Sequence, residues 1–271
     1  MSSPATTYLF VPGNRPERFD KALASGADVV ILDVEDAVTP DEKSDARSAI
    51  AQWCAAATAY RTRLAIRIND PTTSWFADDL ELLRTTGIPV AMLPKAEGPE
   101  PIVQVLRAMT AGALVIPIIE SARGVANVES IASAEGVLRL AFGTLDYAVD
   151  LDLSGDERGL VYAAGRLAIA SKCAGLLSPI AGVTAALDDE GRLEADVAFA
   201  RACGFGAKLC IHPRQVEAVQ RMFAPTPAEI DWAARVVAAA EDHSGAFALN
   251  GKMIDRPVLL KAQAILGRRP K

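Results

Sequence analysis

Short apolar runs rich in β-branched residues alternate along this chain with longer segments of helical periodicity, and this alternation constrains the fold more than any other feature. Eight such runs occur, each followed by a helical segment. They are residues 8–12, 29–34, 63–68, 89–93, 114–119, 137–142, 177–183 and 207–211. Runs that are apolar on both faces are typical of parallel strands covered by helices. The pattern predicts an α/β protein, a (β/α)8 TIM barrel.

An open, doubly wound sheet is the alternative fold for a chain in which strands and helices alternate. It would contain fewer strands and usually a glycine-rich first turn. The sequence contains neither GxGxxG nor GxxxxGK[ST], so the usual nucleotide-binding motifs are absent. The expected helices begin at residue 15 and continue as residues 41–57, 75–85, 101–109, 125–134, 156–174, 193–203 and 214–223.

The chain after residue 223 departs from the repeat. Residues 224–227 form a linker, and Thr226 is expected to cap a helix over residues 228–242. A glycine-bounded, partly extended stretch over residues 245–255 and a last helix over 258–266 follow. We therefore predict a barrel domain over residues 1–223 and a C-terminal helical extension over 224–271. Its apolar surface must pack on its own barrel or on a neighbouring subunit, so a homo-oligomer is expected.

Charge and composition exclude some classes of partner. The net charge of −6 argues against nucleic acid, because binding phosphates needs a cationic face. The apolar runs are far shorter than the roughly 18 residues of a membrane span. The first seven residues lack the basic and apolar segments of a signal peptide. We expect a cytoplasmic protein that contacts neither membrane nor nucleic acid.

Polar side chains follow almost every predicted strand at the point where it ends. In a barrel of this kind these positions form the active-site mouth. The ionisable residues at the predicted strand ends are Arg15, Asp33, Glu35, Asp36, Arg67, Lys95, Glu120, Asp146 and His212. So many charged groups at equivalent positions indicate one coordinated site.

The mixture of charges at this mouth indicates its chemistry. Carboxylate ligands without clustered histidines suit a hard cation, Mg²⁺ or Mn²⁺, which keeps open positions for a chelating substrate. We assign Glu120 and Asp146 to the metal and Glu120 also to substrate binding. Arg67, Arg15 and Lys95 suit a substrate carboxylate, and Arg67 can bind it as a two-pronged fork. The pattern predicts a metal-assisted lyase or aldolase acting on an oxo or hydroxy acid.

Other roles remain open for several of these residues. Asp36 is expected either in the chemistry or as a residue that caps or supports its loop. Asp33 is either reactive or buried in a pair with a cation of the same mouth. Asp150 lies close to Asp146 and is an alternative to it. His212 fits a loop-anchoring residue better than a catalytic base.

Several motifs together resemble one family. They are LFVP (9–12), RPERF (15–19), ILDVED (31–36), RIN (67–69), LPK (93–95), ESARG (120–124), GFGAKLCIHP (204–213) and GKMIDRP (251–257). In this order they resemble the citrate lyase beta-subunit-like proteins of the HpcH/HpaI aldolase family. The resemblance covers essentially the whole chain, and its specificity comes from the set rather than from any one motif.

The resemblance implies a TIM barrel, bound Mg²⁺, a trimeric or hexameric assembly, and cleavage or condensation of acyl-CoA thioesters such as citramalyl-CoA or malyl-CoA. It implies Glu120 and Asp146 as metal ligands and Arg67 as a contact to the substrate carboxylate. Asp255 would act as acid or base in the active site of a neighbouring subunit. Leu145 stands where many relatives have a second acidic residue, which leaves Asp146 as the metal ligand of its loop.

The leading hypothesis is a Mg²⁺-dependent lyase for a 3-hydroxy acyl-CoA, with Asp255, Asp36 and Arg67 as its catalytic group. An aldolase for a free 4-hydroxy-2-oxo acid is the nearest alternative. That branch is expected to have a histidine near the first helix, and residues 1–57 contain none. A citrate lyase beta subunit would need a partner that carries the acyl group. A binding protein that keeps the fold without turnover is the alternative outside enzymes.

Overall fold

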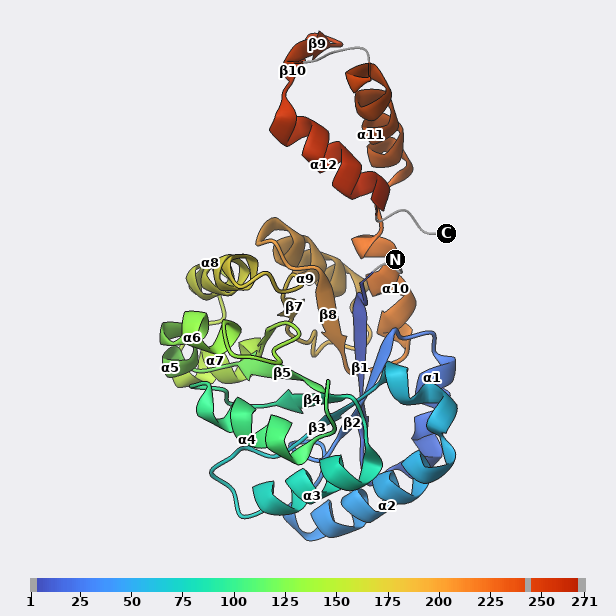
Figure 1. Ribbon diagram of the computed structural model, residues 1–271, viewed down its shortest axis with the longest axis vertical. Coiled ribbons are helices and arrows are strands. Elements are labelled where there is room, and N and C mark those ends of the chain that lie inside the picture. The colour runs from blue at the N-terminus through green and yellow to red at the C-terminus, as the bar shows by residue number, and fades with distance from the viewer. Residues whose placement is uncertain (1–3, 242–244, 268–271) are drawn as a thin grey trace. The chain divides into compact units, whose positions relative to one another are not determined.

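Strands β1 to β8 form a closed barrel in the computed structural model, which describes residues 4–241 and 245–267 (Figure 1). Neighbouring strands are parallel, and β1 closes the barrel on β8 with Tyr8 opposite Leu209. The strands are β1 (Thr7–Pro12), β2 (Val29–Asp33), β3 (Leu64–Arg67), β4 (Val90–Leu93), β5 (Leu114–Ile119), β6 (Ala141–Phe142), β7 (Ile180–Ala181) and β8 (Ala207–Cys210). The predicted fold class and the eight strands are confirmed.

Apolar side chains from all of these strands fill the barrel. The buried cluster consists of Tyr8, Ile31, Ala65, Met92, Ile116, Ile118, Ala141, Ile180, Ala207 and Leu209. Successive side chains of a strand point to opposite faces, so alternate residues of each apolar run fill the interior and the others meet the helices. This is why the runs are apolar on both faces.

Strands β6 and β7 are shorter than predicted because a buried arginine occupies the space between the segments that precede them. Arg139 is 1% exposed and donates hydrogen bonds to Ser178 O (2.8 Å from Nε) and Ala5 O (2.9 Å from Nη1). Ladder pairing therefore begins only at Ala141, opposite Ile180. The predicted strands 137–142 and 177–183 were therefore correctly located, but each was predicted to be longer than it is.

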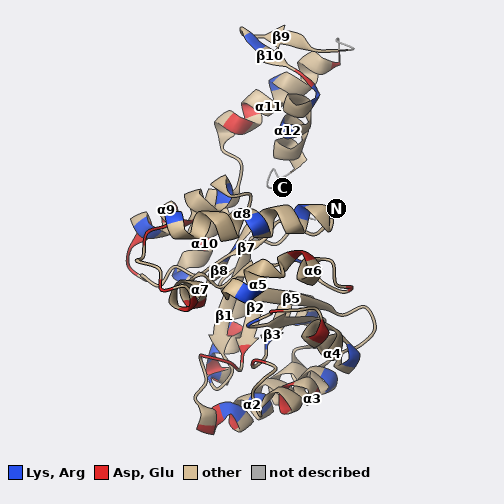
Figure 2. Cartoon of the chain, turned by 90° about the vertical axis from the view of Figure 1, so that its left-hand side faces the viewer, with Lys and Arg blue, Asp and Glu red and all other residues tan. Residues whose placement is uncertain are grey.

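Helices surround the barrel, as Figure 1 shows. The barrel helices are α1 (Phe19–Ala24), α2 (Lys43–Ala56), α3 (Phe76–Thr86), α4 (Glu100–Ala108), α5 (Ala122–Ala126), α6 (Val128–Ala132), α7 (Thr144–Asp150), α8 (Arg158–Cys173), α9 (Glu190–Ala202) and α10 (Arg214–Phe223). Three 3₁₀ turns, η1 (Pro16–Arg18), η2 (Pro40–Glu42) and η3 (Thr58–Arg63), adjoin α1, α2 and β3. Both acidic and basic residues are distributed over the outer helices (Figure 2).

Two helical predictions differ from the structure. The helix expected over residues 125–134 is two short helices, α5 and α6, which meet at Asn127. Helix α7 was not predicted, because ionisable residues that follow a strand, such as Asp146 and Asp150, are typical of a strand-end loop. Tyr147, 3% exposed, anchors α7 by packing edge-on against Phe142 with ring centroids 5.3 Å apart.

A second compact unit begins at Gln220. It contains α11 (Pro227–Ala240), β9 (Phe247–Leu249), β10 (Lys252–Ile254) and α12 (Arg256–Gly267). The predicted cap is confirmed: Thr226 Oγ1 accepts a hydrogen bond from Glu229 N, and Glu229 Oε2 accepts one from Thr226 N at 2.7 Å. Strands β9 and β10 form an antiparallel hairpin whose turn, Asn250-Gly251, has positive φ at both residues.

The compact units divide between Val219 and Gln220, inside α10. The predicted domain boundary after residue 223 and the packing of the extension on another subunit stay predictions. Asp242, the predicted end of α11, lies outside the described residues. No helix among the described residues combines the length and apolar character that a membrane crossing requires.

Candidate active site

The carboxyl ends of the parallel strands bring the predicted ionisable residues to one end of the barrel. Asp33 ends β2, Arg67 ends β3 and Glu120 directly follows β5. All three occupy inward-facing positions of their strands. Strand direction therefore places side chains that are far apart in sequence around a common mouth.

Arg67 is the centre of an ion-pair cluster at this mouth. Its guanidinium donates from Nε to Asp33 Oδ1 (2.8 Å) and from Nη2 to Asp33 Oδ2 (2.6 Å). Its Nη1 lies 2.7 Å from Glu35 Oε2 and 3.8 Å from Asp36 Oδ2. The ring of Phe10 lies 4.6 Å from the guanidinium carbon. The two-pronged edge of Arg67 is thus bound to Asp33. Of the two roles considered for Asp33, the structure shows the buried pair with a cation of the same mouth.

The loop after β2 is held from behind by a second set of buried polar groups. Lys43, 4% exposed, donates from Nζ to Val34 O (2.9 Å) and Glu35 O (3.0 Å). Asn69 Nδ2 donates to Val34 O at 3.0 Å and to Asp79 Oδ2 at 2.7 Å. These bonds fix the backbone from which Glu35 reaches Arg67.

Glu35 and Asp36 differ sharply in environment although they are adjacent. Glu35 is 6% exposed, and burial raises its pKa to about 7, with Arg67 acting in the opposite direction. The side chain of Asp36 is 67% exposed. A buried carboxyl with a pKa near neutrality can exchange a proton at working pH. Glu35 therefore has the properties of an acid–base group, a role that sequence reasoning did not assign to it.

An acidic cavity of about 740 Å³ lies beside this cluster. Glu120, Asp146 and Lys95 line it, together with Asp150 and Ser121. The structure thus places both predicted metal ligands on the wall of one cavity. Lys95 Nζ lies 3.9 Å from Glu35 Oε1, so Lys95 connects the cavity to the Arg67 cluster.

The backbone around Glu120 is shaped to receive its carboxylate. Lys95 has a left-handed conformation (φ 47°), and its N–H donates to Glu120 Oε1 at 2.6 Å. A Cβ at residue 143 would lie 2.6 Å from the Cβ of Glu120 and would collide with Glu120 Oε2. Gly143 is therefore required by close approach, and its missing side chain leaves the space that Glu120 occupies.

The electrostatics of Glu120 suit a cation. The pKa of Glu120 is raised to about 8, mainly by burial and also by the negative charge of Asp146, whereas the hydrogen bond from Lys95 N acts to lower it. Groups of three or more His, Cys, Asp or Glu side chains placed to bind a metal are absent from the described residues. Mg²⁺ commonly takes only one or two protein carboxylates and completes its shell with water and substrate. Glu120 and Asp146 fit that donor set.

Other predicted residues lie apart from this cavity. Arg15 is exposed in the loop after β1. Asp255 belongs to the second unit, where its Oδ1 accepts a hydrogen bond from Val258 N (3.2 Å) at the start of α12. His212 Nδ1 accepts from Arg214 N (3.1 Å), as expected of a loop-anchoring residue.

Asp150, the alternative to Asp146, has a structural partner. Its Oδ2 accepts a hydrogen bond from Ala122 N (2.7 Å) at the start of α5. Asp146 lies one turn earlier on α7 and is exposed to the cavity. Asp146 therefore remains the better candidate for the metal.

The chain belongs to the HpcH/HpaI aldolase/citrate lyase family, which it matches over residues 6–213. It is 36% identical to the citrate lyase subunit beta-like protein of Mycobacterium tuberculosis (strain CDC 1551 / Oshkosh) over 268 residues, 96% of this chain and 94% of that protein. It is 32% identical to the mitochondrial citramalyl-CoA lyase of Rattus norvegicus over 291 residues, 97% of this chain and 85% of that protein.

A solved structure of the same family is similar over the full length. The crystal structure of CitE from Mycobacterium tuberculosis in complex with magnesium, acetoacetate and coenzyme A has a TM-score of 0.87 and 34% sequence identity, and the match covers 98% of each chain. The family expected from the motifs is confirmed.

Proposed function

We propose that this chain is a Mg²⁺-dependent carbon–carbon lyase that cleaves or forms a 3-hydroxy acyl-CoA of the citramalyl-CoA or malyl-CoA type. The observation that carries the proposal is the placement of Glu120 and Asp146 on one cavity wall beside the Arg67 cluster. A relative that is a citramalyl-CoA lyase, and a solved relative that binds magnesium and coenzyme A, support the same reaction class.

Glu120 and Asp146 would hold the metal. The bound ion would supply Lewis-acid polarisation of the oxo-acid oxygen as the bond breaks. In the cleavage direction, the hydroxyl loses its proton and the C–C electron pair passes to the thioester, whose enolate then takes up a proton at carbon. The protein's own residues must therefore bind one carboxylate and move two protons.

Lys95 is the cation best placed for the substrate carboxylate, because its side chain is 48% exposed and lines the cavity. Arg67 remains a proposed substrate contact and catalytic residue. Its two-pronged edge is bound to Asp33, so a substrate carboxylate would meet the Nη1 side, next to Glu35. Arg15 remains a proposed contact to a distant part of the substrate.

Three carboxyls are proposed to handle the protons. Glu35 lies closest to the cationic cluster and has a pKa near neutrality. Asp36 lies at the exposed edge of the same loop. Asp255, contributed by another subunit, would protonate or deprotonate the thioester side. One of its oxygens accepts a hydrogen bond from Val258 N, which orients the carboxylate.

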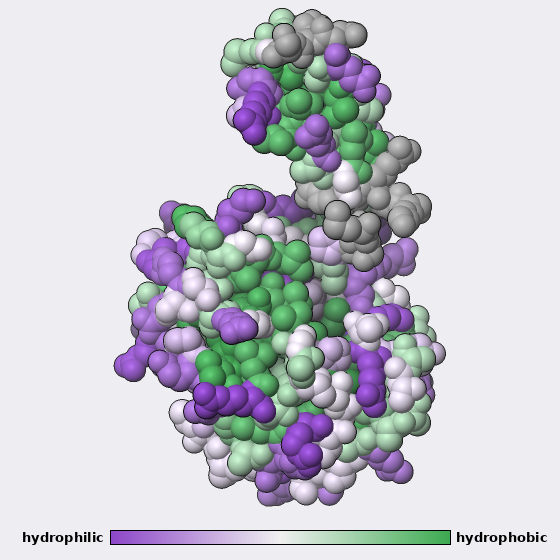
Figure 3. All heavy atoms as spheres, viewed as in Figure 1, coloured by the Kyte–Doolittle hydropathy of each residue, from purple (hydrophilic) through white to green (hydrophobic). Residues whose placement is uncertain are grey.

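Assembly into a homo-oligomer, trimer or hexamer, is part of the proposal. Helices α7 and α8 and the residue after α7 expose large apolar side chains, namely Leu145, Val149, Leu151, Val161, Tyr162 and Ile169. Figure 3 shows a broad hydrophobic area on the barrel face turned toward the viewer. Apolar surface that is contiguous and exposed is characteristic of protein interfaces.

The decisive experiment incubates the protein with Mg²⁺ and a panel of 3-hydroxy acyl-CoA thioesters and free 4-hydroxy-2-oxo acids, and identifies products by mass. Cleavage of a thioester, lost in chelator and in Glu120→Gln, is expected. Glu81→Gln, a carboxylate on the outer surface, is the matched control and should keep activity. Cleavage of free oxo acids alone would favour the aldolase alternative, and full activity in chelator would contradict the mechanism.

A second experiment tests the shared site. Asp255→Asn and Glu120→Gln subunits, each inactive alone, should partly recover activity when mixed under conditions of subunit exchange. Native mass spectrometry, with one of the two variants isotopically labelled, would verify the exchange. Mixed oligomers without activity would show that Asp255 does not act across subunits.

A further inference from the structure

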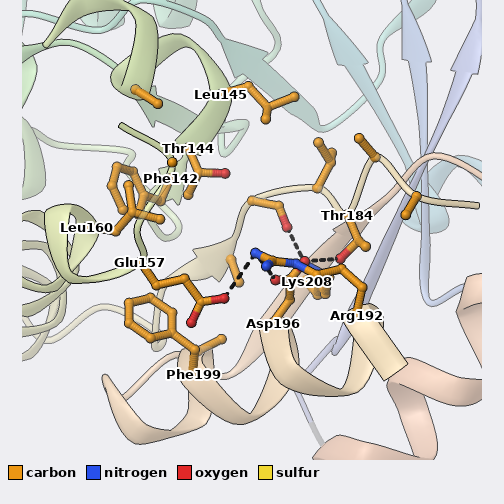
Figure 4. A pocket seen from close by; sticks show the side chains of 18 of the residues that line it. Phe142, Thr144, Leu145, Glu157, Leu160, Thr184, Arg192, Asp196, Phe199 and Lys208 are labelled. Carbon is orange, nitrogen blue, oxygen red and sulfur yellow. Dashed lines mark hydrogen bonds and ion pairs between the residues drawn. The ribbon is translucent and has the colours of Figure 1, made fainter. Parts of the chain in front are cut away.

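A second cavity, of about 360 Å³, lies outside the barrel strands and away from the metal cavity. Its walls come from β7, β8 and the helices α7, α8 and α9. Figure 4 shows Thr144 and Leu145 on one side, Phe142 and Leu160 on another, and Thr184, Arg192, Asp196 and Lys208 gathered at the opposite end. The cavity thus has an apolar body and one polar end.

The polar end is almost balanced in charge. Arg192 Nη2 lies 2.8 Å from Asp196 Oδ1 and 3.0 Å from Glu157 Oε1. Asp196 Oδ2 accepts a hydrogen bond from Thr184 Oγ1 at 2.5 Å. Lys208, the second cation, lies 4.0 Å from Asp196 Oδ2. A third lining carboxylate, Asp156, pairs with Arg158 Nη2 at 2.6 Å. Each carboxylate therefore has a cationic partner, so the cavity favours an uncharged ligand over an ion.

Lys208 retains donor capacity that its surroundings do not use. The residue is 2% exposed, and among the described residues its Nζ donates one hydrogen bond, to Gly182 O at 2.6 Å. An ammonium has three N–H donors. Unmet donors in a buried charged group are costly, and an acceptor oxygen would satisfy them. Desolvation at this position lowers the pKa of Lys208 to about 8.

Helix α7 separates this cavity from the metal cavity. Thr144, Leu145 and Ala148 line the apolar cavity, whereas Asp146 and Val149 line the acidic one. The two cavities share no lining residue. A ligand behind α7 would therefore be distinct from the substrate and would contact the helix that carries Asp146.

We propose that this cavity is a second ligand site, which binds an aliphatic chain ending in an uncharged carbonyl group, with the carbonyl oxygen accepting from Lys208. An apolar cavity of about 150 Å³ holds benzene, which has six non-hydrogen atoms, so a cavity of about 360 Å³ accommodates a ligand of up to about fourteen. Octanamide, which is smaller than this limit, has the required chemistry. Octylamine matches the chain but offers a cation instead of an acceptor.

Calorimetric titration of the whole protein with octanamide and octylamine tests the site. Octanamide is expected to bind, and octylamine at least tenfold more weakly. Leu160→Trp, which fills the cavity, should abolish octanamide binding, whereas Lys172→Trp, at an exposed position of the same helix outside the cavity, should not. Lys208→Met should weaken binding about tenfold or more, as expected for one hydrogen bond from a charged group, and Lys172→Met should leave it unchanged.

Glu120→Gln tests whether the octanamide site is independent of the metal site. This variant should bind octanamide with the affinity of the wild type. Circular dichroism and thermal melting would verify that each variant is folded. Octanamide binding that survives Leu160→Trp, or that disappears in Glu120→Gln, would overturn the proposal, as would equal affinity for octylamine or no binding of octanamide.

Discussion

Arg67 donates two parallel hydrogen bonds to the carboxylate of Asp33, which is 1% exposed. This pair occupies the very edge of Arg67 that a substrate carboxylate was expected to use. Because the remaining nitrogen contacts Glu35, Arg67 orders two buried acids at once. Arg67 therefore has a structural role, because it fixes the positions of the Asp33 and Glu35 carboxylates relative to the cavity lined by Glu120 and Asp146.

Arg67→Lys tests this role. Lysine keeps the charge and loses the planar fork, so Asp33 and Glu35 cannot both remain bound. We expect the free energy of unfolding to fall by about 2–3 kcal/mol, as for the loss of a hydrogen bond to a charged group, and activity to fall at least tenfold. Chemical denaturation and steady-state kinetics measure both. Arg84→Lys, in an exposed pair with Glu81, is the control and should change neither.

Lys43→Met tests the support behind the loop. The change leaves Val34 O without its lysine bond and Glu35 O without a donor from this side chain. We expect kcat to fall, because the backbone bearing Glu35 loosens, while Mg²⁺ affinity stays unchanged, because Lys43 does not line the metal cavity. Lys21→Met, on the exposed face of α1, should match the wild type. A fall in Mg²⁺ affinity without a fall in kcat would contradict this assignment.

The structure shows which parts of this site are encoded locally and which are not. Strand ends predicted that Glu120 and Asp146 would share a cavity, because parallel strands of a barrel deliver their ends to one face. The partners of Lys43 and Asn69 were not predictable, since each bonds to backbone carbonyls and no residue pattern marks such a bond. Neither was Arg139, whose partner Ala5 lies 134 residues away in the chain.

The role of the C-terminal segment could also not be predicted from local sequence patterns alone. Capping of α11 by Thr226 follows from adjacent residues and was predicted correctly. The proposed action of Asp255 depends on another subunit, and a single sequence does not encode which surfaces of two copies meet. Helix α7 shows a similar limit, because its polar residues resemble a loop until Tyr147 packs on Phe142.

The pKa of Glu120 predicts that Mg²⁺ binding is linked to proton release. Its folded-state pKa of about 8 lies above the ordinary 4.5, so between these values the metal-free protein holds an extra proton relative to the unfolded chain. The stability of the metal-free protein therefore falls as pH rises through this window. The metal needs the ionised carboxylate, so its affinity should rise about 50-fold from pH 6 to pH 8.

Thermal melting with and without Mg²⁺ at pH 6 and pH 8 measures this linkage, because a ligand of the folded state raises the melting temperature according to its affinity. The Mg²⁺-induced shift should be larger at pH 8, and calorimetry in two buffers should detect release of up to one proton. Glu120→Gln should remove both the shift and its pH dependence. An equal shift at both pH values would contradict a proton on Glu120 in the metal-free protein.

Gly143→Ala tests the close approach that shapes the metal cavity. Residue 143 has φ −82°, a conformation open to alanine, so the only cost of the substitution is steric. The new methyl group would collide with Glu120 Oε2 and lie 2.6 Å from its Cβ, which forces the carboxylate out of its position. We expect Mg²⁺ affinity to fall at least tenfold and thioester cleavage to fall with it.

Gly165→Ala, in α8 with no atom within 4 Å of the new methyl, is the matched control. It should leave affinity unchanged and stabilise the protein by about 0.5–1 kcal/mol, because alanine favours the helix. Wild-type Mg²⁺ affinity in Gly143→Ala would show that the carboxylate of Glu120 does not bind the metal from the position described.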